Sequence, residues 1–352
     1  MGENIKTHTF REAFLTEGGD YLAEPTVAYQ TWGKLNKKRD NVVLVCHALT
    51  GNTAADEWFN GLFGPGKALD ADQHFIICPN ALGSCYGTTG PTDINPETGA
   101  AYRIDFPKIT IRDMVRLQQQ LFDELQISGI EIVIGGSMGG MQALEWCIMD
   151  DRPRSAIFIG MGKAHSPWAI GISHTQRQAI YADPNWNGGR YSNEQSPAQG
   201  LALARQIAMI SYRSETDYAS KFGRHSQPKS NQFQVESYLS YQGKKLTARF
   251  DAASYVRLTQ AMDSHDVARD RESAEQVLAT INIPTLIVGI DSDRLYPPQE
   301  QHELAELLPD ARYRRIRSIH GHDAFLIEFE QLNNIIAPFL LEIPTKTVPT
   351  LQ

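Results

Sequence analysis

Long apolar segments are missing from this sequence. No run of about 18 consecutive apolar residues occurs in its 352 residues, and a helix that crosses a bilayer needs roughly that length. The first residues, MGENIKTHTFREAF, contain no apolar stretch of the kind found in signal peptides. The N-myristoylation pattern also fails, because its sixth position is occupied by Lys6. We therefore expect a cytoplasmic protein with no membrane partner.

Cysteine is scarce, and basic residues are fewer than acidic ones. The four cysteines form no CxxC pair and have no metal-ligand spacing to histidine, so neither a disulfide framework nor a zinc site is indicated. The formal net charge is -8, which argues against a nucleic-acid partner because such proteins need basic surface. The apolar fraction of 41% and the charged fraction of 21% are ordinary for a globular protein.

Short apolar runs indicate the strands of a buried sheet. They are nearly continuous rather than alternating, as expected for strands that are buried on both faces of a parallel sheet. These runs are 41–48, 74–80, 131–137, 155–161 and 285–290, followed by a more polar strand-like run at 311–319. A helical stripe at 111–125 precedes the third run. Alternating strands and helices predict an α/β fold with helices flanking a mostly parallel central sheet.

The middle of the chain interrupts this alternation. Between residues 165 and 280 no convincing buried strand occurs, whereas 199–213 and 252–268 have apolar residues at helical spacing. The strand–helix alternation resumes at residue 281. We predict one core domain, made of residues 1–164 and 281–352, with residues 165–280 inserted as a helical lid.

Residues 135–139 read Gly-Gly-Ser-Met-Gly between a strand-like and a helix-like run. This G-x-S-x-G pattern is typical of the nucleophile elbow of α/β-hydrolases, a sharp turn that exposes a serine hydroxyl above the sheet. The pattern alone is weak, but its position between such a strand and helix makes it specific. We predict that Ser137 is the nucleophile and that the chain has the α/β-hydrolase fold.

An acyl-transfer serine needs N–H donors for the oxyanion that develops on the carbonyl oxygen. One donor is expected to be the backbone N–H of Met138, the residue after the nucleophile. The second is expected in the loop His47–Gly51, which directly follows the first apolar run, with the Leu49 N–H as the candidate. His47 is interpreted as a support for this turn.

The acid and the base should follow the serine in that order, in loops after late strands. The run 285–290 is followed by Asp291 and Asp293, and spacing alone does not choose between them. His320 and His322 compete in the same way; His322 is favoured because it directly precedes a helix-like run. The chemistry requires no metal, and no HExxH motif occurs.

The chain resembles the homoserine O-acetyltransferase family over most of its length. The resemblance is carried by several motifs in the family's order. They are HALTG (47–51), NALGSCYGTTGPTDINPETG (80–99), FPKITIRDMV (106–115), GGSMGGMQALEW (135–146), ARQIAMISYRS (204–214), FGR (222–224), SDRLYPP (292–298) and GHDAFL (321–326).

This resemblance implies a catalytic triad of Ser137, Asp293 and His322. It also implies that homoserine is bound by Arg205 and Tyr212, with Asp323 near its ammonium group. The residue types fit, because an arginine can hold a carboxylate and an aspartate can hold an ammonium group. The structural alternatives are a solvated helix residue for Arg205, a core aromatic for Tyr212, a structural ion-pair partner for Arg213 and a helix cap for Asp323.

The implied function is acetyl transfer from acetyl-CoA to the L-homoserine hydroxyl on the route to methionine, by a ping-pong acyl-serine mechanism. Acetyl-CoA is then a co-substrate, and no cofactor is expected. The resemblance also implies a homodimer formed through the lid. Alternatives are a succinyl-CoA donor, serine as the acceptor, an esterase, and a catalytically silent binding protein.

Overall fold

The computed structural model describes residues 5–228 and 230–343. Its centre is an eight-stranded sheet in the order β1-β4-β6-β5-β7-β8-β9-β10. The strands of this sheet are β1 (Lys6–Thr9), β4 (Thr26–Trp32), β5 (Val42–Cys46), β6 (Phe75–Pro79), β7 (Ile130–Gly136), β8 (Ala156–Ile159), β9 (Thr285–Ile290) and β10 (Ala311–Ile316). A separate hairpin pairs β2 (Phe14–Leu15) with β3 (Tyr21–Leu22).

The sheet is mostly parallel, as predicted. The strands from β6 to β10 pair in parallel, whereas β4 is antiparallel to both β6 and β1 at the other edge. All six predicted runs are strands in this sheet. The predicted fold class is therefore confirmed.

Both faces of the central strands are buried, and successive residues enter different cores. In β5, Val42 and Leu44 belong to one apolar cluster, and Val43 and Val45 belong to the other. The first cluster is covered by α2 (Ile111–Glu124), α3 (Met138–Met149), α9 (Ala274–Leu278) and α10 (Pro298–Leu307). The second is covered by α1 (Ala55–Trp58) and α11 (Phe329–Glu342). This two-sided burial explains why the strand sequences are continuous apolar runs.

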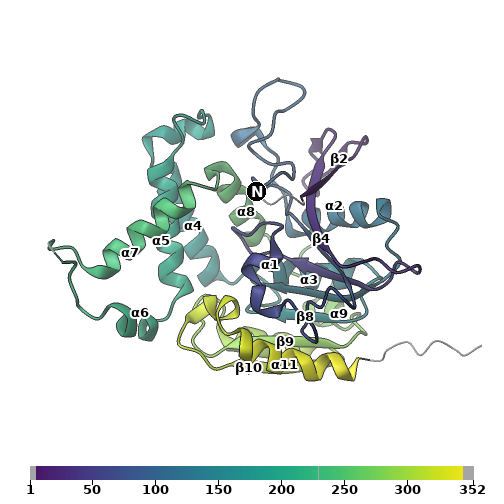
Figure 1. The fold of residues 1–352 in the computed structure, drawn as a ribbon. Helices are drawn as coiled ribbons and strands as arrows, with labels where there is room; N and C mark the ends of the chain where they lie inside the picture. Colours follow the sequence, from purple (N-terminus) through teal and green to yellow (C-terminus); the bar gives the residue numbers. More distant parts are fainter. Residues whose placement is uncertain (1–4, 229, 344–352) are drawn as a thin grey trace, which may run out of the picture.

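Between β8 and β9 the chain forms helices that extend to one side of the sheet (Figure 1). They are α4 (Pro167–Tyr181), α5 (Ala198–Tyr212), α6 (Glu215–Phe222), α7 (Gln234–Thr247) and α8 (Ala252–Asp263). The helices α5 and α8 correspond to the two helical patterns in the sequence. The predicted lid limits, residues 165 and 280, stay a prediction.

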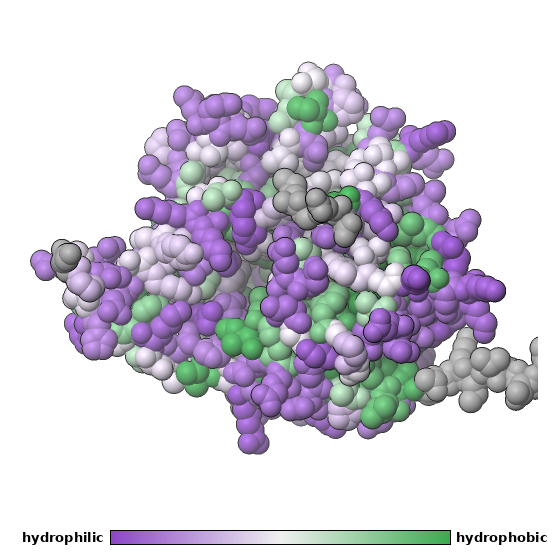
Figure 2. Space-filling view, in the orientation of Figure 1, coloured by the Kyte–Doolittle hydropathy of each residue, from purple (hydrophilic) through white to green (hydrophobic). Residues whose placement is uncertain are grey.

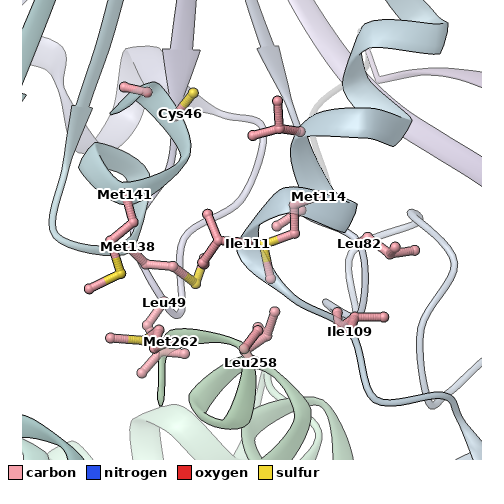
Figure 3. Close-up of a cluster of buried hydrophobic side chains, with 14 of the residues drawn as sticks. Cys46, Leu49, Leu82, Ile109, Ile111, Met114, Met138, Met141, Leu258 and Met262 are labelled. Atoms are coloured by element: carbon pink, nitrogen blue, oxygen red, sulfur yellow. The ribbon is translucent and has the colours of Figure 1, made fainter. Parts of the chain in front are cut away.

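Methionine and aliphatic side chains join α8, a helix of the predicted lid, to the predicted core. Figure 3 shows Met138 and Leu49 of the core close to Met262 and Leu258 of α8. All four side chains are buried, so the lid base and the core share one apolar cluster. This packing holds α8 against the loops that carry the predicted oxyanion donors. Within the described ranges, none of the helices combines the length and apolarity that a bilayer-spanning segment needs.

Candidate active site

Ser137 occupies the sharp turn between β7 and α3. Its backbone has φ 55° and ψ −126°, a conformation that is strained for a residue with a side chain. Its N–H donates to the carbonyl of Ile159, with 2.9 Å between nitrogen and oxygen, which ties the turn to the neighbouring strand. The side chain lines a pocket.

Glycines on both sides of Ser137 allow this turn to pack. A Cβ on Gly139 would lie 2.0 Å from the carbonyl oxygen of Cys46, and one on Gly135 would lie 2.2 Å from the carbonyl oxygen of Gly139. Backbone atoms cannot move away as a flexible side chain could. The glycines of the motif are therefore required by close backbone packing as well as by the turn itself.

His322 and Asp293 are hydrogen-bonded, with 2.6 Å between Nδ1 and Oδ2. The other oxygen of Asp293 accepts from the backbone N–H groups of Leu295 and Tyr296 at 2.8 and 2.9 Å. Both side chains of the pair are buried, and His322 lines the same pocket as Ser137. The aspartate therefore fixes the orientation of the ring, and Nε2 has no hydrogen-bond partner among the described residues.

Two opposing effects set the basicity of His322. Burial lowers its pKa, because an imidazolium loses hydration when it is enclosed. The negative charge of Asp293 and the hydrogen bond to it act in the opposite direction and prevail, so the pKa of His322 is raised above its ordinary value. Three aromatic rings, from Tyr212, Tyr296 and Phe325, lie within 5.8 Å of the imidazole between ring centres.

Asp291 and His320, the alternatives to Asp293 and His322 as acid and base, have other partners. Asp291 forms an ion pair with Arg315 at the outer edge of the sheet. His320 contacts Asp217 at the start of α6, with 2.7 Å between Nδ1 and Oδ1. The structure thus brings Asp293 rather than Asp291 to His322, a choice that spacing alone did not provide.

The loop that carries His320 is attached to the lid. The hydroxyl of Ser214, which caps α6, donates to the carbonyl of Ile319. Gly321 has φ +65°, and a Cβ there would lie 2.7 Å from the carbonyl oxygen of Tyr212. The segments 212–217 and 319–321 are therefore in direct contact beside the pocket.

Two backbone N–H groups near Ser137 lack acceptors. Within the described ranges, neither Leu49 nor Met138 donates its N–H to a protein atom, although both residues are buried. His47 supports the first of these loops: its Nδ1 lies 2.9 Å from the Ala48 carbonyl, and its Nε2 accepts from the Ala81 N–H. Burial lowers the pKa of His47, which favours a neutral ring in this supporting role.

The pocket has a volume of about 430 Å³ and lies between the core and the lid. It brings together Ser137, His322 and the three predicted substrate-binding residues, whereas Asp293 lies behind the histidine. The lining side chains are those of Ala48, Leu49, Thr50, Asn52, Glu57, Trp58, Ser137, Arg205, Tyr212, Lys245, Arg249, His322, Asp323, Phe325 and Leu326, together with Gly51.

Arg205 is a cation without an anionic partner. Its Cζ lies 5.5 Å from the centre of the Tyr212 ring. Among the described residues, no carboxylate forms an ion pair with it and no side-chain hydrogen bond engages it. Burial raises the pKa of Tyr212, so its hydroxyl stays protonated at neutral pH. This pair offers a positive group and a hydroxyl next to His322.

Asp323 is the acidic group beside the histidine. It forms an ion pair with Arg213, with 3.0 Å between Oδ2 and Nε, and Arg213 also contacts Asp217 at 3.4 Å. Sequence reasoning placed Asp323 near a substrate ammonium and considered Arg213 as a structural ion-pair partner, but it did not name Asp323 as the partner of Arg213. Arg213 directly follows Tyr212, and nothing in the sequence pattern indicated which way it points.

Sequence reasoning also missed Trp58, Lys245 and Arg249 in the pocket lining. Lys245 and Arg249 belong to the α7 region, which the sequence analysis did not identify as a helix, and packing of α7 against α5 brings them to the pocket. No local signal could have identified them. In the part of the chain that the structure describes, no three His, Cys, Asp or Glu side chains are grouped so that they could hold a metal ion.

Comparison with protein families matches residues 41–328 to the alpha/beta hydrolase fold. Homoserine O-acetyltransferase of Trichormus variabilis is 55% identical over 348 residues, which cover 99% of this chain and 97% of that protein. The protein of the same name from Moorella thermoacetica is 49% identical and covers 93% of each chain. The sequence similarity to these proteins therefore extends over nearly the whole length.

Comparison with solved structures shows that the fold is similar as well. Homoserine O-acetyltransferase from Bacillus anthracis has a TM-score of 0.90 at 28% identity, covering 98% of this chain and 100% of the other. Esterase E22 has a TM-score of 0.88, also at 28% identity, covering 96% and 100%. Because a transferase and an esterase match almost equally well, the fold alone does not distinguish acyl transfer to an alcohol from transfer to water.

Proposed function

Since this chain belongs to the homoserine O-acetyltransferase family of the alpha/beta hydrolase fold, we propose that it transfers an acetyl group from acetyl-CoA to the hydroxyl of L-homoserine. The identity of 55% over nearly the full length carries this proposal. The pocket supports it, because groups suited to both ends of an amino acid lie beside a serine and a histidine. The product, O-acetylhomoserine, fits the expected role in methionine biosynthesis.

In the first half-reaction, the Ser137 hydroxyl attacks the thioester carbonyl while His322 accepts the proton. The N–H groups of Leu49 and Met138 stabilise the oxyanion, since they have no other acceptor among the described residues. Asp293 stabilises the imidazolium through its 2.6 Å hydrogen bond. The C–S bond then breaks, CoA leaves as a thiol with the proton from His322, and Ser137 carries the acetyl group.

In the second half-reaction, homoserine binds to the acetyl-enzyme. The Arg205 guanidinium binds its carboxylate, the Tyr212 hydroxyl helps to orient it, and Asp323 binds its ammonium group. His322 removes the proton of the homoserine hydroxyl, which attacks the acetyl carbon. Collapse of the tetrahedral intermediate returns the proton to Ser137 and releases O-acetylhomoserine.

Water competes with homoserine for the acetyl-enzyme. The rings of Tyr212, Tyr296 and Phe325 lie against His322 and make the surroundings of the base largely apolar. Bound homoserine gains a large effective concentration from its two charged contacts. These features favour transfer over hydrolysis.

A steady-state assay with homoserine tests this proposal, comparing acetyl-CoA with succinyl-CoA and identifying the products by mass. We expect O-acetylhomoserine as the main product. O-succinylhomoserine would keep the mechanism and change the donor. Thiol release with free acetate as the only acyl product would support the esterase alternative, which the likeness to esterase E22 makes the main rival.

The homodimer and the cytoplasmic location stay predictions. Exposed apolar side chains on α4 and α5 support an association through the lid; they belong to Trp168, Leu203 and Ile210. Sedimentation analysis at micromolar concentration tests it, and a mass equal to one chain would contradict the dimer.

A further inference from the structure

Two basic residues of the α7 region reach the pocket that contains Ser137. Lys245 lies in the last turn of α7, and Arg249 follows one turn later. The residue between the helix and Arg249, Ala248, still has helical angles (φ −72°, ψ −12°). Side chains four residues apart in such a segment project from the same side. The two cations therefore form a pair along one edge of the pocket.

Neither cation is neutralised within the described part of the chain. Lys245 is exposed, and no ion pair or hydrogen bond to it is found there. Arg249 donates only to uncharged oxygens: the Thr50 carbonyl at 2.8 Å, the Tyr86 hydroxyl at 2.6 Å and the Thr50 hydroxyl at 3.3 Å. The positive charges of Lys245 and Arg249 are therefore available to an anionic ligand, although the net charge of the chain is -8.

The lining has a buried end and an exposed end. Ser137 and His322 are buried, and Arg205 with Tyr212 lies beside the histidine. Lys245 and Arg249 are exposed. The acidic side chains of the lining are Glu57 and Asp323, and Asp323 is already paired with Arg213.

An acyl-CoA is a polyanion whose phosphates are separated from the thioester by a long neutral pantetheine arm. When the thioester reaches a buried serine, the phosphates must stay at the exposed end. A protein of net negative charge repels such a donor unless cations act locally. We propose that Lys245, together with Arg249, binds the phosphate groups of the acyl-CoA donor. This inference rests on the proposed function, because it assumes that the donor is a CoA thioester.

A further observation on α7 agrees with a nucleotide at this end. Tyr241 lies one turn before Lys245 on the same side of the helix and is 60% exposed. An exposed aromatic ring next to a phosphate-binding cation is suited to stack on a nucleotide base. The visible surface over α6 and α7 is mostly hydrophilic (Figure 2).

Lys245→Glu is the decisive variant, and Lys244→Glu is its matched control. Lys244 is also exposed, and its replacement by glutamate changes the net charge by the same amount, but Lys244 does not line the pocket. Arg249 is less suitable, because its loss would also release Thr50 in the oxyanion loop. Each variant is assayed with acetyl-CoA and with acetyl-pantetheine, which keeps the thioester and the arm but lacks the nucleotide phosphates.

We expect Lys245→Glu to raise KM for acetyl-CoA about tenfold over Lys244→Glu. KM for acetyl-pantetheine and for homoserine should be equal in both variants. Equal KM for acetyl-CoA in the two variants would overturn the inference, and so would a KM for acetyl-pantetheine that rises in parallel. Equal melting temperatures would show that both variants are folded.

A binding measurement separates this inference from the proposed function. Free CoA is titrated into each variant by calorimetry, which needs no turnover. Weaker binding by Lys245→Glu alone supports phosphate recognition even if wild-type protein fails to acetylate homoserine. If the wild-type protein forms O-acetylhomoserine but the two variants bind CoA equally well, the proposed function stands and the phosphate site is rejected.

Discussion

Nδ1 of His322 and Oδ2 of Asp293 lie 2.6 Å apart in a buried hydrogen bond. The carboxylate raises the pKa of His322 against the opposing effect of burial. The neutral ring is the base, so kcat/KM should fall as the pH drops through this raised pKa, at a pH above the ordinary histidine value of 6.5. A pH–rate profile for thiol release checks this acid limb.

Asp293→Asn should lower kcat by about 10⁴-fold, because the ring loses both its orientation and the partner of its positive form. The remaining activity should have its acid limb at lower pH, since burial alone lowers the pKa of His322. Asp291→Asn is the control, because its carboxylate contacts Arg315 instead. Equal losses in the two variants would contradict the assigned role of Asp293.

Wild-type protein mixed with acetyl-CoA in the absence of homoserine should accumulate one acetyl group per chain. The adduct should map to Ser137 by mass spectrometry of proteolytic fragments. Ser137→Ala should form no adduct and should lose transfer activity. An adduct on another residue, or full transfer activity in Ser137→Ala, would exclude the ping-pong mechanism.

Arg205→Ala should raise KM for homoserine by roughly 10- to 100-fold, because a charged hydrogen bond to the substrate carboxylate is lost. KM for acetyl-CoA should not change. Homoserinol, in which a hydroxymethyl group replaces the carboxylate, should react equally well with both proteins. Arg224→Ala, which removes an exposed arginine outside the pocket lining, is the control. A loss of the same size with homoserinol would argue against carboxylate binding by Arg205.

Gly139→Ala should lower the free energy of unfolding by about 3 kcal/mol or more. The new methyl group would lie 2.0 Å from the Cys46 carbonyl oxygen. Gly171→Ala in α4 meets no atom within 4 Å and should raise the free energy of unfolding by up to about 1 kcal/mol. Urea denaturation compares them, and similar midpoints would refute the packing argument.

Most of the strands that are buried on both faces were predictable. Continuous apolar runs such as 41–48 are typical of strands in that environment. The edge strand β1, with the sequence KTHT, is largely exposed and has no apolar pattern. The helix α7 buries only Gly243 and Leu246 completely, and its stripe of Val235, Tyr238, Leu239 and Leu246 was not recognised. The largely buried strand β4 was also missed, because Gln30 and Thr31 interrupt its apolar run.

In the site, local chemistry was predictable and long-range contacts were not. Ser137 could be predicted because its turn needs glycines within a few residues. Asp291 and Asp293 share one loop, so spacing could not choose between them; the family resemblance implied Asp293, and this carboxylate contacts His322 in the folded chain. Lys245 and Arg249 reach the pocket through helix packing that no local sequence pattern encodes.

The contact between segments 212–217 and 319–321 has a consequence for engineering. Asp217 and His320 are 103 positions apart in the chain. Together with the Ser214–Ile319 hydrogen bond and the close packing of Gly321, they form one contact surface, here called the seam. A chimera that takes its lid from one relative and its histidine loop from another would join two unmatched halves of this seam. Recombination between such proteins should therefore succeed only when both segments come from the same parent.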